Sequence, residues 1–206
     1  MEKLDLYLSE YDLPFDVDKD LVAKLAMVVK KSFELLKTDE GHNFDNHAIP
    51  VLKNTIDLLI ESNYKGQYST EVMCAALLHD RSRFFVGHLP TTTIQRAIMN
   101  SLSIDLVFQN RVLEIISTHS ELVQTDPFKE EKEVLFLADK KEFVNWERAE
   151  VALKTMPRWI ISKYKKEWIK RIPDIEEKVL GFIDKYPKFV GEFEMMLSIS
   201  KENLGV

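Results

Sequence analysis

Residues 71–80 read Glu-Val-Met-Cys-Ala-Ala-Leu-Leu-His-Asp, and this stretch decides the fold class of the chain. Residues three, four and seven positions apart share one face of a helix. The face formed in this way is apolar, ends in an imidazole, and consists of Val72, Ala75, Ala76 and His79. Ser69 and Thr70 stand just before it and are candidate N-caps. The stretch therefore predicts a helix that carries His79 on its inward side.

The same helical spacing of apolar residues recurs on both sides of this stretch. We expect helices from Asp16 or Asp18 to about residue 36, and over about 51–60, 94–102, 108–119, 127–143, 151–156 and 159–172, with a last pair separated at Pro187. No alternation of apolar and polar residues lasts long enough to predict a sheet. The chain is predicted to be all-α.

Composition indicates one domain. The chain has 206 residues, of which 45% are hydrophobic, and this is enough for one sizeable core. No linker rich in Gly, Ser or Pro divides it. We therefore expect a single helical domain over 1–206, with a bundle core over about 20–145 and a C-terminal helical extension over about 146–206.

Charge and cysteine content narrow the class of protein. No apolar run approaches the ~20 residues that cross a bilayer, and the polar N-terminus is unlike a secretory signal. Cys74 is the only cysteine, so a reducing, cytoplasmic location is expected. A net charge of −6 argues against a nucleic-acid-binding surface, since phosphate backbones require clustered Lys and Arg. A small anionic ligand remains compatible with this charge.

Further polar residues interrupt the apolar faces of other predicted helices. Asp139 lies within an apolar stripe, His119 ends another, and His47 lies on the inward side of a third helix. A buried carboxylate without a partner costs several kcal/mol, so Asp139 requires a metal, a cation or several hydrogen bonds. One ion would satisfy His47, His79 and Asp139 together. The alternatives are an ion pair of Asp139 with a nearby Lys or Arg, and histidines that are hydrogen-bonded boundary residues.

At this point the order of the motifs resembles the HD superfamily of metal-dependent phosphohydrolases. Ala75-Ala-Leu-Leu-His-Asp80 is similar to the helix that carries that family's His-Asp doublet. His47, in His42-Asn-Phe-Asp-Asn-His47, matches the early His, and Leu137-Ala-Asp139-Lys-Lys-Glu142 resembles the late Ala-Asp motif. The likeness covers about residues 40–145 and depends on the order and spacing of the three motifs.

The resemblance implies a ligand set and the kind of metal that it holds. His47, His79, Asp80 and Asp139 would bind a divalent transition metal, and mixed His and carboxylate ligands suit Mn, Fe, Co, Ni or Zn. Adjacent side chains on a helix diverge by ~100°, so His79 and Asp80 can share one ion only over a helix end. Some members hold two ions, and His88 and His119 stand about where the extra ligands would be. Ser120 departs from that pattern, because two-metal members often have a second His there.

The implied activity is hydrolysis of a small nucleotide-type phosphomonoester or phosphodiester by a metal-activated water. Asp80 would orient or deprotonate the water, and Arg81 and Arg83 would reach the substrate, although both fit an ordinary exposed surface equally well. The further candidates for substrate contact are Lys140, Lys141 and His42. A homodimer is also compatible with the sequence.

Two alternatives stay open at this stage. One is an HD-fold enzyme of non-phosphate chemistry, such as a hydratase or an oxygenase. The other is an inactive binding or regulatory module, which is favoured by Arg81-Ser-Arg83-Phe-Phe, a departure from the usual residues after the doublet.

Overall fold

The computed structural model describes residue 8 and residues 13–36, 44–80, 92–117, 127–156 and 158–206. Within these ranges the chain is helical and contains no strand, which confirms the all-α prediction. The elements are α2 (Lys19–Leu36), the π-helical turn η2 (Phe44–Ala48), α3 (Ile49–Glu61), α4 (Ser69–Leu78), α5 (Thr93–Ser101), α6 (Leu106–Ser117), α7 (Lys129–Phe143), α8 (Trp146–Thr155), α9 (Arg158–Leu180) and α10 (Pro187–Leu204).

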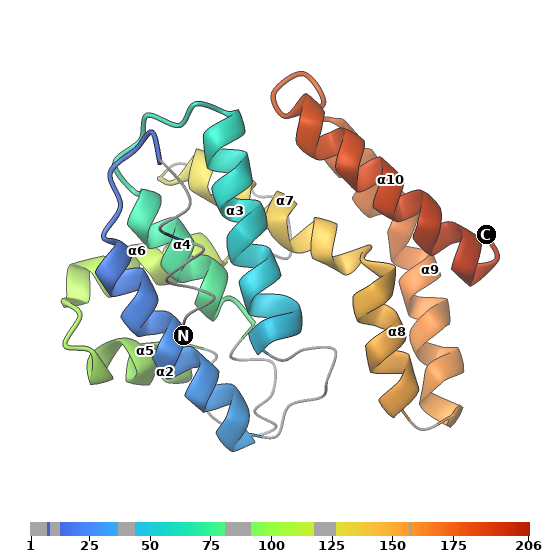
Figure 1. Cartoon of the computed structure of the whole chain (residues 1–206), viewed down its shortest axis with the longest axis horizontal. Helices are drawn as coiled ribbons and strands as arrows, with labels where there is room; N and C mark the ends of the chain where they lie inside the picture. Colours follow the sequence, from blue (N-terminus) through green and yellow to red (C-terminus); the bar gives the residue numbers. More distant parts are fainter. Residues whose placement is uncertain (1–7, 9–12, 37–43, 81–91, 118–126, 157) are drawn as a thin grey trace.

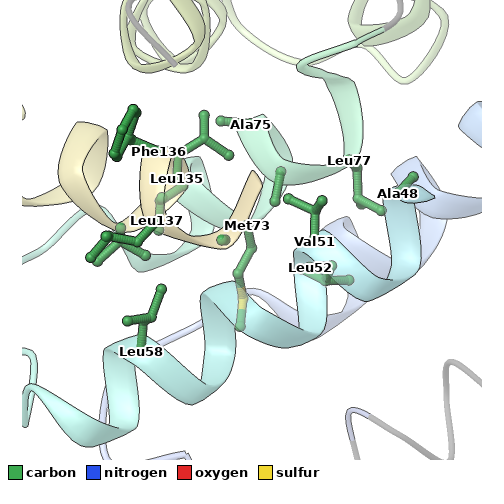
Figure 2. Packing of buried hydrophobic residues seen from close by; sticks show 14 of the residues in the cluster. Ala48, Val51, Leu52, Leu58, Met73, Ala75, Leu77, Leu135, Phe136 and Leu137 are labelled. Atoms are coloured by element: carbon green, nitrogen blue, oxygen red, sulfur yellow. The ribbon is translucent and has the colours of Figure 1, made fainter. Parts of the chain in front are cut away.

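Helix α4 lies at the centre of the core. Every residue from Glu71 to Leu78 is buried, so the helix is enclosed around its whole circumference. It contacts α2, α3, α6 and α7. Figure 2 shows Met73 and Leu77 of α4 beside side chains of α3 and α7 such as Val51, Leu52 and Leu135. A helix of only ten residues is marginal in isolation, so this packing is what stabilises α4.

One predicted N-cap, Asp18, is confirmed, and the predicted N-caps of α4 are wrong. Asp18 Oδ1 accepts a hydrogen bond from the amide of Leu21 at 2.8 Å, as an N-cap does. Ser69 and Thr70 do not cap α4. Instead, Ser69 Oγ donates to the carbonyl of Asp16, and Thr70 Oγ1 accepts from the amide of Asp18 at 3.0 Å. The two hydroxyls therefore attach the segment before α2 to the start of α4.

The C-terminal helices form a second group beside the central one. In Figure 1, α7 runs from the core to α8, and α10 lies along α9. The predicted end of a helix at residue 172 is wrong, because α9 continues through Pro173 to Leu180. Proline removes one helical hydrogen bond, but Ile172, Ile175 and Val179 on the same helix are all buried. Their packing keeps the helix continuous.

Within the described ranges, none of the helices combines the length and the apolar character that crossing a membrane requires.

Candidate metal centre

Four buried side chains meet at the end of α4. His47 comes from η2, His79 and Asp80 follow the last turn of α4, and Asp139 comes from α7. One ligand atom from each lies within 4.8 Å of all the others. This group can hold a metal ion. It is the same set of residues that the sequence motifs predict, and His79 and Asp80 meet over the helix end as their divergence requires.

The distances between these atoms suit one ion. His47 Nε2 lies 3.0 Å from His79 Nε2 and 2.8 Å from Asp80 Oδ2. Asp139 Oδ1 lies 3.4 Å from His79 Nε2 and 3.9 Å from His47 Nε2. Transition-metal bonds to His and carboxylate are ~2.0–2.2 Å long, which places neighbouring ligand atoms ~3–3.5 Å apart. The donor set therefore fits a transition metal in both chemistry and spacing.

A hydrogen bond within α4 orients the ring of His79. Its Nδ1 lies 2.8 Å from the carbonyl oxygen of Ala76. A carbonyl only accepts, so Nδ1 carries the proton and donates it. In the neutral imidazole, Nε2 then presents a lone pair to the other three groups. Metal-binding histidines are commonly oriented by such a bond from the second ring nitrogen.

The two histidines have opposite pKa shifts. Burial and the nearby positive charge of Arg148 lower the pKa of His47 to about 3, so this ring is neutral at ordinary pH. Burial also lowers the pKa of His79, but the charge of Asp80 and the hydrogen bond and charge of Asp139 outweigh it and raise that pKa above 6.5. The carboxylates of Asp80 and Asp139 thus favour a positive charge at the centre of the cluster.

Lys140 and Lys141 leave α7 toward different partners. Lys140 is buried, and its Nζ donates to Asp139 Oδ2 at 2.6 Å. Burial raises the pKa of the Asp139 carboxyl, but the charges of Lys140 and His79 hold it well below its usual range. Lys141 Nζ instead pairs with Glu192 on α10 at 2.5 Å. Of the two predicted substrate lysines, only Lys140 lies at the metal centre.

A cavity of about 180 Å³ opens beside the cluster. Asp80 and Asp139 form part of its wall, and helices α7, α8 and α9 supply the remainder. The described residues that line it are Asp80, Asp139, Lys140, Glu142, Phe143, Asn145, Arg148, Ala149, Ala152, Tyr164 and Arg171. A small ligand in this cavity would have both the carboxylates of the cluster and basic side chains within reach.

Sequence reasoning missed Arg148 and Arg171. Both follow residue 145, where the recognisable motifs end, and each is an ordinary arginine on an amphipathic helix. Their position beside the cluster arises only from tertiary structure, because α9 packs against α7 and Arg148 of α8 binds the carbonyl oxygen of Glu142. Five predicted site residues lie outside the described residues, namely His42, Arg81, Arg83, His88 and His119. Their roles remain predictions.

Comparisons with protein families, with curated proteins and with solved structures find no match for this chain.

Proposed function

We propose that this protein is a metal-dependent phosphohydrolase that acts on a small phosphate ester, with nucleotides as the first class to test. The observation that carries the proposal is the buried set of His47, His79, Asp80 and Asp139, which borders a cavity that Lys140, Arg148 and Arg171 also line. The order of these residues along the chain, which resembles the HD superfamily, supports it further. The proposal therefore depends on the site and on this motif order.

The four side chains would hold Mn, Fe, Co, Ni or Zn, since His and carboxylate ligands suit these metals. A divalent ion there would supply Lewis acidity and would make water a nucleophile at neutral pH. His47 and His79 present ring nitrogens to the same point, and Lys140 holds the outer oxygen of Asp139. The protein thus contributes a ligand geometry that is already assembled in the folded chain.

Asp80 is the residue best placed to handle a proton. Its carboxylate belongs to the donor set and also lines the cavity. In the proposed reaction a water oxygen forms a bond to phosphorus and the ester P–O bond breaks. Asp80 accepts the proton that the water loses and passes it to the leaving oxygen, which departs as an alcohol. Lys140 and Arg148 border the same space, where their charges would offset the negative charge of the phosphoryl oxygens.

Metal analysis and turnover together test this proposal. The metal content of the purified chain would be measured, and phosphate release from p-nitrophenyl phosphate, bis-p-nitrophenyl phosphate and a nucleotide panel would be followed with added Mn²⁺. We expect about one metal per chain and metal-dependent phosphate release. His79→Ala should lose both properties, whereas Asp184→Asn, at an exposed carboxylate of no described site, should keep both.

Two results would overturn the proposal. A chain that neither holds nor uses added ions would indicate a binding module. A metal-loaded chain that releases no phosphate would instead favour hydratase or oxygenase chemistry at the same centre.

A further inference from the structure

The charges around the cavity define the charge of the ligand that it suits. Among the described lining residues, three are basic, namely Lys140, Arg148 and Arg171, and three are acidic, namely Asp80, Asp139 and Glu142. With all six ionised and both histidines neutral, these charges cancel, and a divalent ion would leave a net charge of +2. A phosphomonoester is close to a dianion at neutral pH, because its second pKa is ~6. A phosphodiester carries only one negative charge.

Two of the basic residues come from the C-terminal helices. Arg148 of α8 donates from Nη1 to the carbonyl oxygen of Glu142 at 3.0 Å, which places its guanidinium at the end of α7. Arg148 also lines the cavity together with Asp80 and Asp139 of the cluster. Arginine is suited to this position, since its planar guanidinium can bind two phosphate oxygens at once.

Arg171 of α9 is held at the cavity by an aromatic ring. Its Cζ lies 4.7 Å from the centroid of Phe143, which also lines the cavity. Phe143 in turn packs edge-on against the buried Trp168, with ring centroids 6.1 Å apart. A cation over an aromatic face is attracted by the ring, and the contact restricts the long side chain. Arg171 therefore stays beside the cavity although it belongs to an exposed part of α9.

The size of the cavity limits what else can enter. Its volume of about 180 Å³ is below the ~300–1,000 Å³ of pockets that enclose whole drug-sized ligands. A phosphate group fits, and the organic part of the ester would extend from the mouth. Recognition would then depend chiefly on the charge and shape of the phosphate.

From these observations we infer that the substrate is a phosphomonoester whose phosphate is bound by Arg148 and Arg171, an inference that rests on the proposed function of the same centre. The helices after residue 145 are then part of the substrate site. The reaction that precedes this one must supply a monoester, and the products are an alcohol and inorganic phosphate.

Calorimetric titration of the full metal-loaded chain with inorganic phosphate tests the inference without depending on turnover. Dimethyl phosphate serves as the monoanionic probe. At pH 8 we expect inorganic phosphate to bind at least about tenfold more tightly than dimethyl phosphate does. Arg148→Gln and Arg171→Gln should each weaken phosphate binding roughly 10- to 100-fold, the usual effect of removing a charged hydrogen bond.

Lys170→Gln is the matched control, because Lys170 is an exposed cation next to Arg171 that does not line the cavity. It should bind phosphate as the unmodified chain does. Arg171 is exposed, so Arg171→Gln should fold normally even if loss of the Arg148 bond to Glu142 destabilises the other variant.

Equal affinity for the two probes, or unchanged phosphate affinity in both arginine variants with intact metal content, would overturn the inference. A metal-loaded chain that hydrolyses esters but shows either result would leave the proposed function standing. The opposite outcome is a chain that holds no metal but binds phosphate, with weaker binding in the arginine variants. That outcome would overturn the proposed function and retain the two arginines as an anion site.

Discussion

Lys140 binds one oxygen of Asp139 while the other oxygen faces the histidines. Its Nζ donates to Oδ2 at 2.6 Å, and Oδ1 lies 3.4 Å from His79 Nε2. The two residues are adjacent on α7, and the ammonium group also lies 5.2 Å from the ring centroid of Phe136. Lys140 therefore acts through Asp139 as a positioning residue for the metal site.

Replacing Lys140 by Met should weaken metal binding. Met keeps an apolar side chain beside Phe136 but removes the hydrogen bond that orients the Asp139 carboxylate. Loss of such a partner of a metal ligand typically costs ~10–100-fold in affinity. Competition titration with a chromophoric chelator measures this constant. Lys141→Met is the matched control, because Lys141 pairs with Glu192 and should leave metal affinity unchanged.

Removing the metal should lower stability. An ion that binds only the folded chain adds about 2.7 kcal/mol to the free energy of unfolding when its concentration is 100 times the dissociation constant. We therefore expect a chelator to lower the melting temperature, and excess Mn²⁺ to restore it, in thermal unfolding followed by circular dichroism. His79→Ala should melt at the same temperature with and without Mn²⁺. An equal response of this variant to metal would contradict the ligand assignment.

Glu142 should make stability depend on pH in acid. Burial raises the pKa of its carboxyl, although Asn54 and Asn145 donate hydrogen bonds to it at 2.9 and 3.1 Å. The folded chain then binds more protons than the unfolded chain between pH 4.5 and the raised pKa. The protonated Glu142 carboxyl therefore adds to the free energy of unfolding in full below pH 4.5. This contribution is lost as pH rises through the pKa of the folded state.

Glu142→Gln should abolish the loss of stability that the Glu142 carboxyl causes as pH rises. Urea unfolding of metal-free protein at a series of pH values gives the free energy of unfolding for each chain. As pH rises, the free energy of unfolding of Glu142→Gln should increase relative to that of the unmodified chain. A constant offset from the altered hydrogen bonds leaves that slope unaffected, so a difference independent of pH would contradict the prediction.

Trp168→Ala should loosen the C-terminal helices. Trp168 is 3% exposed, stacks on Trp146 with a centroid distance of 5.9 Å, and contacts Phe143 of α7. Truncating a buried Trp to Ala typically costs about 3–5 kcal/mol. Urea unfolding measures this loss. Lys170→Ala, at an exposed position two residues later, should change the free energy of unfolding by no more than about 0.5 kcal/mol.

The sequence predicted what depends on local pattern. The apolar spacing around His79 predicted that this ring faces the core, and it is buried. A buried Asp139 was expected to need a metal, a cation or several hydrogen bonds, and Lys140 supplies a cation beside the histidines. The spacing of Tyr164 and Trp168 is typical of a helix face that packs on the core, and Trp168 is buried with Tyr164 beside it.

Features that depend on tertiary packing could not be predicted in the same way. Ser69 and Thr70 have the composition of helix caps, but the segment before α2 offers them other partners. Pro173 normally ends a helix, yet buried neighbours on both sides keep α9 continuous. Arg148 and Arg171 are 23 residues apart in sequence and line one cavity only because of the tertiary arrangement of α7, α8 and α9.

The enclosure of α4 has a consequence for mutational scans of this protein. His79 and Asp80 continue directly from a helix that is surrounded by close-packed side chains, so a change of volume at Ala75 or Ala76 has no solvent face through which to relax. The displacement would instead run along the helix axis to the two ligands. Substitutions that touch none of the four candidate ligands would then reduce the proposed activity, and a screen that reads that activity alone would mistake interior alanines for members of the candidate site.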